Sequence, residues 1–279
     1  MATTDLHFIA GGLHPVHRGI RFLGGNVDDG VQVDAAAAAI VGGNHTIGTI
    51  TAWIMVPDQT GTYTIFGAGD ASAVEYMHFT IEAGTLQAVF VNAGPTTNID
   101  VNTASGTIKA HQWHHVAMVQ DGARIKMYID GIDMPLTFTT ETTPGQWFED
   151  LDVIDGAHIG AADSIAGGGL LTLEFKGYIS DVRIYSGTTA ANALSANEIR
   201  EVASGKIVGT AHNIWSLDQV LTDEGTGADD GTGVGDIIFS DGNEFSSRLT
   251  FLETTPLTAN NTVIMSDGGV GFAYSPLAA

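Results

Sequence analysis

The sequence predicts an all-β protein, and three observations support this fold class. Short strand-like segments recur at residues 50–57, 62–66, 76–82 and 86–91. Turns rich in Gly, Asp and Asn separate them. Only one stretch, at residues 196–203, has clear helix signals. Short strands at such regular spacing are typical of a sandwich or a barrel and not of an α/β fold.

The stretch from residue 111 to residue 131 predicts a β-hairpin around which the chain is organised. In its first strand one face consists of Trp113, His115, Ala117 and Val119. Asp121-Gly122 supplies the turn, because Gly accepts a positive φ and Asp tolerates it. The second strand places its apolar residues on one face, at Ile125, Met127 and Ile129. This period of two predicts a half-buried antiparallel hairpin.

The motifs of this hairpin, W-H-H-V-A, a D-G turn and Y-I-D-G, resemble the central hairpin of the laminin-G-like, concanavalin-A-like jelly rolls. Three more segments match that family in order: IRFLGGNVDDGVQV, ITAWIMVP, and FKGYISDVRIY followed by LSANEI. The match spans residues 19–204, and four motifs in order are specific although each is short. The resemblance implies an antiparallel jelly-roll sandwich with one short helix.

Local signals divide the chain into two predicted parts. A jelly roll occupies residues 1–204, with an N-terminal arm at 1–18, and its closing helix begins after the N-cap Ser195, which Glu198 completes as a capping box. Residues 205–279 form a β-rich C-terminal extension. Its W-x-L-D motif resembles the usual start of a laminin-G-like domain. The extension therefore either supplies a missing outer strand or forms a separate unit, and its many β segments favour a separate unit.

Composition restricts the partners. The formal net charge is −22, which repels nucleic acid and anionic membranes and favours cations or basic partners. The chain has no cysteine and hence no disulfide or thiolate chemistry. No apolar run approaches the roughly 18 residues of a membrane span, so we expect no membrane insertion. The first residues lack the basic and apolar regions of a secretory signal.

The sequence does not contain the carboxylate pattern that catalysis on this fold requires. Glucanases of the resembled superfamily need two carboxylates facing one groove, as in E-x-D-x-x-E on a strand. The nearest cluster, residues 149–152, lies in a predicted loop over 135–155 and has the wrong spacing. Nucleophile-elbow, phosphate-loop and H-E-x-x-H motifs are also absent. We therefore predict that the protein is not an enzyme.

Calcium is the metal that the sequence favours, because calcium binds carboxylate and carbonyl oxygens from Asp/Gly loops. The resemblance implies a site near the rim of the sandwich, with Asp28, Asp29 and Asp181 as candidate ligands. The alternative is that these acids form turns and solubilise the surface. The Asp229-Asp230 loop is a weaker candidate. His114 and His115 are adjacent on a strand, so they point to opposite faces and are expected to be structural.

A glycan site requires exposed aromatic rings beside polar groups. Trp147 and Phe148, with Asp150 next to them, form the aromatic pair that we expect to be exposed. The same rings could instead fix their loop to the core or bury against another subunit.

The sequence predicts a non-catalytic protein with a binding or structural function. We favour a virion surface component, a capsid decoration or fibre protein of a bacterial or archaeal virus, synthesised in the host cytoplasm. Its partners would be further copies of itself, most simply in a trimer, or capsid proteins, with the arm and the extension at the subunit contacts. The alternative is an extracellular glycan-binding adhesion module at a cell surface. A glycoside hydrolase with an unrecognised site is a third class.

Overall fold

A computed structural model describes most of the chain. The described residues are 18–24, 29–70, 75–92, 96–151, 154, 156–163, 171–235, 237–240, 261–264 and 273–276. Residues 1–17 of the predicted arm and Asp28 therefore lie outside the described residues. The chain separates into two compact units, Met1–Gly242 and Asn243–Ala279. In the second unit the described elements are β19 (Asn261–Ile264) and β20 (Ala273–Pro276), which pair antiparallel.

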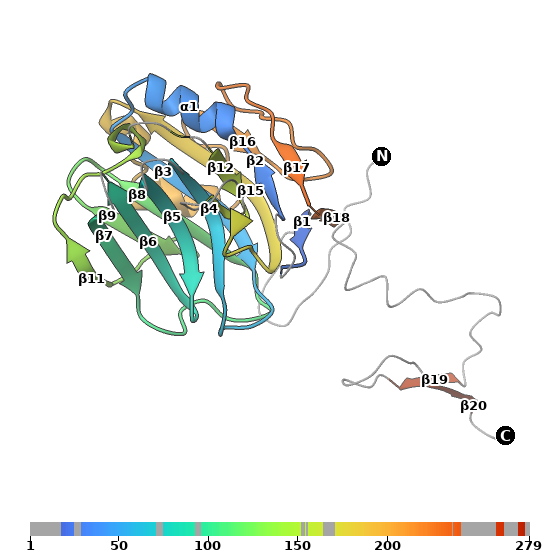
Figure 1. Ribbon diagram of the computed structural model, residues 1–279. Coiled ribbons are helices and arrows are strands. Elements are labelled where there is room, and N and C mark those ends of the chain that lie inside the picture. Colours follow the sequence, from blue (N-terminus) through green and yellow to red (C-terminus); the bar gives the residue numbers. More distant parts are fainter. Residues whose placement is uncertain are drawn as a thin grey trace. The chain divides into compact units, whose positions relative to one another are not determined.

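The first unit is a two-layer β-sandwich (Figure 1). The first sheet has the order β10-β9-β8-β3-β15-β1-β18, and β16 also pairs with β15. Its strands are β10 (Ile132–Asp133), β9 (Ile125–Ile129), β8 (His114–Gln120), β3 (Ile47–Met55), β15 (Gly177–Gly187), β1 (Gly19–Phe22), β18 (Ile237–Ser240) and β16 (Asn213–Trp215).

The second sheet has the order β11-β7-β6-β5-β4-β12-β2-β17. Its strands are β11 (Leu136–Glu141), β7 (Thr96–Thr103), β6 (Thr85–Asn92), β5 (Glu75–Glu82), β4 (Thr62–Asp70), β12 (Gly156–Ile159), β2 (Gly30–Gln32) and β17 (Thr232–Val234). A small pair, β13 (Ala162–Asp163) and β14 (Leu171–Thr172), completes the strands of this unit. Apolar side chains from both sheets form one shared core. The predicted all-β antiparallel sandwich is confirmed.

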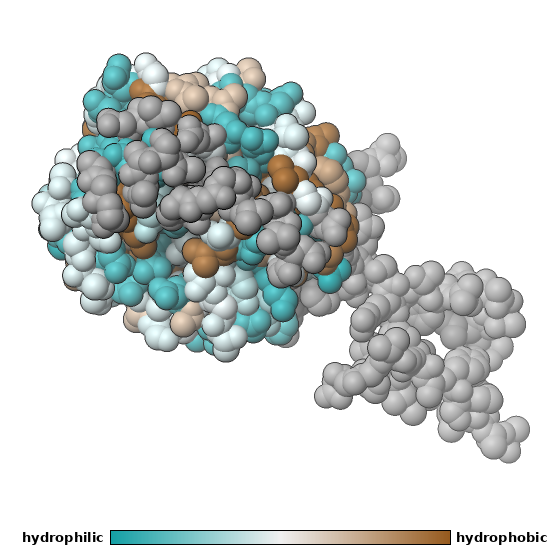
Figure 2. All heavy atoms as spheres, in the orientation of Figure 1, coloured by the Kyte–Doolittle hydropathy of each residue, from teal (hydrophilic) through white to brown (hydrophobic). Residues whose placement is uncertain are grey.

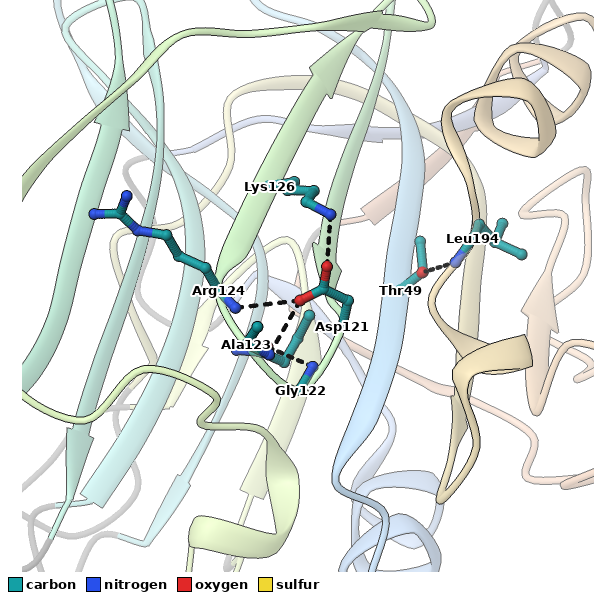
Figure 3. Close-up of polar contacts among 8 residues, drawn as sticks. Thr49, Asp121, Gly122, Ala123, Arg124, Lys126 and Leu194 are labelled. Atoms are coloured by element: carbon teal, nitrogen blue, oxygen red, sulfur yellow. Dashed lines mark hydrogen bonds and ion pairs between the residues drawn. The ribbon is translucent and has the colours of Figure 1, made fainter.

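The predicted central hairpin is present as β8 and β9. The Asp121 carboxylate holds its turn by accepting hydrogen bonds from the backbone N–H groups of Ala123 at 3.1 Å and Arg124 at 3.2 Å (Figure 3). Gly122 has a φ of +86°, which glycine adopts without strain. Val116 and Met118 point into the core between the sheets. The alternation in the sequence therefore predicted the core-facing residues of this hairpin correctly. The expectation that it is half-buried is wrong for β8, because the closing helix (Ala196–Ala203) covers Ala117 and Val119 on its outward face.

The closing helix α2 (Ala196–Ala203) also matches its prediction. The Ser195 hydroxyl accepts from the Glu198 N–H at 3.4 Å, and the Glu198 carboxylate accepts from the Ser195 N–H at 2.8 Å. The helix buries Ile199 and Val202 on the outward face of the first sheet. The Thr49 hydroxyl of β3 accepts from the Leu194 N–H at 3.0 Å, which ties the start of the helix to the sheet (Figure 3).

An alanine-rich segment forms a second helix, although only residues 196–203 had clear helix signals in the sequence. Helix α1 spans Asp34–Gly42 and buries Ala36, Ala37 and Ile40. The Asp34 carboxylate accepts from the Ala157 N–H of β12 at 2.7 Å, so a tertiary contact stabilises the first turn. No helix among the described residues is long and apolar enough to cross a bilayer.

Two regions differ from the sequence predictions. The predicted loop over residues 135–155 contains the edge strand β11 and the 3-10 helix η1 (Phe148–Asp150). A second 3-10 helix, η2 (Ala190–Asn192), precedes α2. Strand β11 pairs with β7. Neither strand was predicted from the sequence.

The segment after Gly205 does not form a separate extension as far as Ser240. Strand β16 pairs with β15, β17 pairs with β2, and β18 pairs with β1. Trp215 and Leu217 of the W-x-L-D motif are fully buried in the shared core, and the Trp215 indole N–H donates to the Asp229 carbonyl at 3.1 Å. Both sheets of the jelly roll therefore depend on residues beyond 204, because this core is incomplete without Trp215.

Candidate functional site

The outward face of the second sheet carries a row of polar side chains. On β5, Met77, Phe79 and Ile81 point into the core. The alternating residues therefore point outward, and they are Tyr76, His78 and Thr80. The two faces of β5 therefore differ in polarity: the core-facing side chains are apolar, and the outward side chains can form hydrogen bonds.

Strand register extends this row onto β6 and β7. Thr80 lies opposite Gln87, and Gln87 lies opposite Asn102. One pair further along, Asp100 lies opposite Val89. We define the polar strip as the outward side chains of three neighbouring strands: Tyr76, His78, Thr80, Gln87, Asp100 and Asn102. Tyr76, Gln87, Asp100 and Asn102 are partly exposed.

Hydrogen bonds fix the side chains of the polar strip. The Gln87 amide donates to the Asp100 carboxylate at 3.0 Å, and the Thr80 hydroxyl donates to the Gln87 amide oxygen at 3.4 Å. Two pairs of neighbouring polar groups are thus held in place before any ligand arrives, which lowers the entropy cost of binding.

An aromatic pair lies at one end of the polar strip. The rings of Tyr76 and His78 stack, with centroids 4.3 Å apart and planes 24° from parallel. Burial, and then the negative charge of Asp100, raises the pKa of the Tyr76 hydroxyl above its ordinary value. That hydroxyl is therefore protonated at neutral pH and can donate a hydrogen bond. A ring face beside donors and acceptors matches the surface of a sugar.

A small flap formed by β13 and β14 bounds the strip on the β4 side. A Cβ atom at Gly67 of β4 would lie 2.9 Å from the Ala161 carbonyl oxygen and 2.9 Å from the Ala162 Cα. The backbone of the flap therefore crosses directly over β4. It explains why the outward-facing His78 and His158 are only 6% and 5% exposed.

Charge distinguishes this face from a site for anions. The central strands β4 to β7 contain no lysine or arginine, while Asp70, Glu75, Glu82 and Asp100 are acidic. Figure 2 shows mainly hydrophilic and intermediate residues among those coloured on the visible side of the jelly roll. The polar strip can therefore hydrogen-bond and stack, but it offers an anionic group no cationic partner.

The predicted aromatic pair lies elsewhere, and the prediction that it is exposed is wrong. Trp147 and Phe148 are both 0% exposed. The Trp147 indole N–H donates to the Ser186 hydroxyl at 2.9 Å, and the Asp150 carboxylate accepts from the Trp147 backbone N–H at 2.9 Å. These residues fix their loop to the core, since buried indole needs a partner for its N–H. A glycan cannot stack on either ring.

The structure places two of the predicted calcium ligands at different sheets. Asp29 is fully buried next to β2 of the second sheet. Asp181 lies in β15 of the first sheet, where its two oxygens accept from the Arg183 guanidinium, each at 2.7 Å. Asp28 lies outside the described residues, among which no three metal-ligating side chains cluster. Calcium binding stays a prediction, and Asp181 is the candidate with the strongest competing contact.

Two other candidates have structural partners. The Asp223 carboxylate accepts from the Asp229 N–H at 2.8 Å, and the Asp230 carboxylate accepts from the Asp223 N–H at 2.9 Å, so these acids organise their own loop. His114 lies 2.8 Å from the Asp130 carboxylate and accepts from the Lys109 N–H at 3.1 Å. Its role is to connect the hairpin to the preceding loop.

The polar strip was not among the sequence predictions, although part of its signal was present. Tyr76, His78 and Thr80 alternate with apolar residues in a segment that was predicted as a strand. Their neighbours Asp100 and Asn102 come from β7, whose sequence TTNIDVNT has little apolar character. Only the register of three strands brings these residues together.

The sequence comparison defines the class of protein. Residues 24–200 match the model of the concanavalin A-like lectin/glucanases superfamily, and the chain belongs to this family. The resemblance noted in the sequence is thereby confirmed. No curated protein matches the chain.

Solved structures share the fold at low sequence identity. A carbohydrate-binding module of family 40 from the Ruminococcus gnavus IT-sialidase has 18% identity and a TM-score of 0.52, covering 67% of this chain and 98% of its own. A native heptameric SAP-like pentraxin from Limulus polyphemus has 17% identity and a TM-score of 0.50, covering 82% and 97%. A putative carbohydrate binding protein from Bacteroides ovatus has 15% identity and a TM-score of 0.50, covering 85% and 66%.

Proposed function

We propose that this protein is a non-catalytic glycan-binding module whose polar strip binds a neutral saccharide. The observation that carries the proposal is the stacked Tyr76–His78 pair beside the Gln87–Asp100 hydrogen bond on one outward face. Sugars present apolar C–H faces and hydroxyl groups together, and this face offers a partner for each.

The fold adds independent support. The R. gnavus module is also known bound to α2,3-sialyllactose, and the B. ovatus protein is described as carbohydrate-binding. Sialic acid carries a carboxylate, but the polar strip lacks lysine and arginine. We therefore infer that its ligand is neutral, since the Asp100 carboxylate would repel an anion.

None of the three similar structures named above is described as a virion protein. The virion surface location and the homo-oligomeric or capsid partners stay predictions. Absence of catalysis is part of the proposal, supported by the lack of a paired-carboxylate strand in the sequence and by the binding modules that share the fold.

A glycan array followed by calorimetry tests the proposal. We expect the full chain to bind neutral oligosaccharides, and Tyr76→Ala to weaken binding of the tightest of them roughly fivefold, since losing a packed aromatic contact costs about 1 kcal/mol. Tyr76→Phe keeps the ring and should retain most of the affinity. Thr139→Ala, on the exposed edge strand β11, is the matched control and should bind normally.

Two results would refute the proposal. One is an array on which no neutral saccharide binds. The other is an equal affinity of wild type and Tyr76→Ala when both proteins have the same circular dichroism spectrum and melting temperature. Sugar release from a bound oligosaccharide would contradict its non-catalytic part.

A further inference from the structure

The outward face of the first sheet carries a second set of aromatic residues, away from the polar strip. Register places Arg21 of β1 opposite Tyr178 of β15, and Tyr178 opposite Met55 of β3. Trp113 precedes β8, whose residues His114 and His115 pair with Ile54 and Trp53. Continuing that register by one residue places Trp113 opposite Met55.

One ring contact joins strand β15 to the residue before β8, and a second joins β3 to β8 next to it. The rings of Trp113 and Tyr178 lie 6.1 Å apart at 54°, and those of Trp53 and His115 lie 5.4 Å apart at 68°. Trp53, His115 and Met55 are buried, whereas Trp113 and Tyr178 are partly exposed. We define the aromatic row as Arg21, Tyr178, Met55 and Trp113. It presents two amphipathic rings on a floor of buried side chains.

Positive charge gathers beside the aromatic row in a strongly acidic chain. The sequence has only 10 lysines and arginines against 32 acids. Arg21 and Lys176 are both exposed, and they lie near each other because Phe22 pairs with Gly177. Arg21 has five N–H donors in a planar fork, so it can hold a carboxylate in addition to other contacts.

We propose that the aromatic row is a second ligand site, which binds an acidic saccharide. Trp113 and Tyr178 contact the C–H face of the sugar ring, and Arg21 and Lys176 pair with its carboxylate. The site is independent of the polar strip, because the two lie on the outward faces of opposite sheets. Its ligand differs in charge, because the strip contains the Asp100 carboxylate, whereas the row contains Arg21 and has Lys176 beside it.

Calorimetry with trigalacturonic acid and its methyl ester tests this site, since esterification removes only the negative charge. We expect the full chain to bind the acid at least fivefold more tightly than the ester, and to lose this preference as salt rises. Arg21→Gln should reduce the preference, because Lys176 remains, while Tyr178→Ala should weaken the binding of both ligands. Lys206→Gln, an exposed lysine elsewhere, is the control and should retain the preference.

Tyr76→Ala separates the two proposals, because it should weaken neutral-saccharide binding at the polar strip and leave trigalacturonic acid binding unchanged. Equal affinity for acid and ester would overturn the second site. An unchanged preference in a folded Arg21→Gln variant would overturn it as well. Loss of acid binding in Tyr76→Ala would place that ligand on the polar strip instead.

Discussion

At the scale of single residues, burial assigns Trp147 to the core. A Cβ atom at Gly48 would lie 2.4 Å from the Trp147 ring, so β3 uses a glycine there to accommodate the indole. We predict that Trp147→Ala lowers the free energy of unfolding by about 3–5 kcal/mol, as for other buried aromatics. Urea denaturation measures this. A stability loss below that of Tyr76→Ala would contradict the assignment.

The Asp58 carboxylate contributes to the stability of the fold in a way that depends on pH. It accepts hydrogen bonds from the Thr60 backbone and hydroxyl, each at 2.9 Å, and from the Tyr63 hydroxyl at 2.8 Å. The Thr60 backbone bond, followed by Tyr63, lowers the pKa of Asp58 to about 2. Since the folded-state pKa lies below the unfolded value of 3.8, the stabilisation is present above pH 3.8 and is lost as the pH falls through about 2.

Asp58→Asn should therefore melt at a lower temperature than wild type at neutral pH. The difference between the two melting temperatures should shrink between pH 4 and pH 2, because the wild-type carboxylate becomes protonated in that window. Thermal melts across this range check the prediction. A difference that stays constant down to pH 2 would show that the charge of Asp58 contributes nothing.

At the scale of elements, local signals were sufficient for the β8–β9 hairpin and for α2. The Asp121-Gly122 turn and the Ser195–Glu198 cap are set by residues close in sequence. Strand β7 pairs with β11, and the strands β16, β17 and β18 pair with β15, β2 and β1, in each case across an intervening segment of the chain. A local sequence pattern does not identify such partners. The polar strip required the pairing of three strands, so the sequence could predict the strands of its β5 and β6 residues but not the contribution of β7.

The flap over β4 gives a prediction at this scale. Gly67→Val should push the flap away, because the new side chain would meet the backbone of Ala161 and Ala162. We expect a loss of about 1–3 kcal/mol in unfolding free energy, as for other overpacked sites, measured by urea denaturation. Gly42→Ala, at the end of α1 with no atom near its Cβ, is the control and should not destabilise. Equal stability of Gly67→Val and wild type would show that the flap does not rest on β4.

For the whole molecule, the strands after Gly205 belong to the sandwich. A chain ending at Gly242 keeps β16, β17 and β18 and should fold, because residues from 243 onward form a separate unit. A chain ending at Gly205 loses Trp215 and Leu217 from the core and should be unfolded or aggregated. Circular dichroism and size-exclusion chromatography compare the two. Similar cooperative melting of both chains would contradict this account.

The central claim is that the polar strip binds a neutral saccharide, and nuclear magnetic resonance tests it most directly. The measurement is a map of backbone amide shifts in the full chain, titrated with the neutral oligosaccharide that gives the strongest array signal. The account predicts that the largest shifts fall on β5, β6 and β7, around Tyr76, Gln87 and Asp100. Shifts confined to other strands, or no shifts at millimolar saccharide, would contradict it.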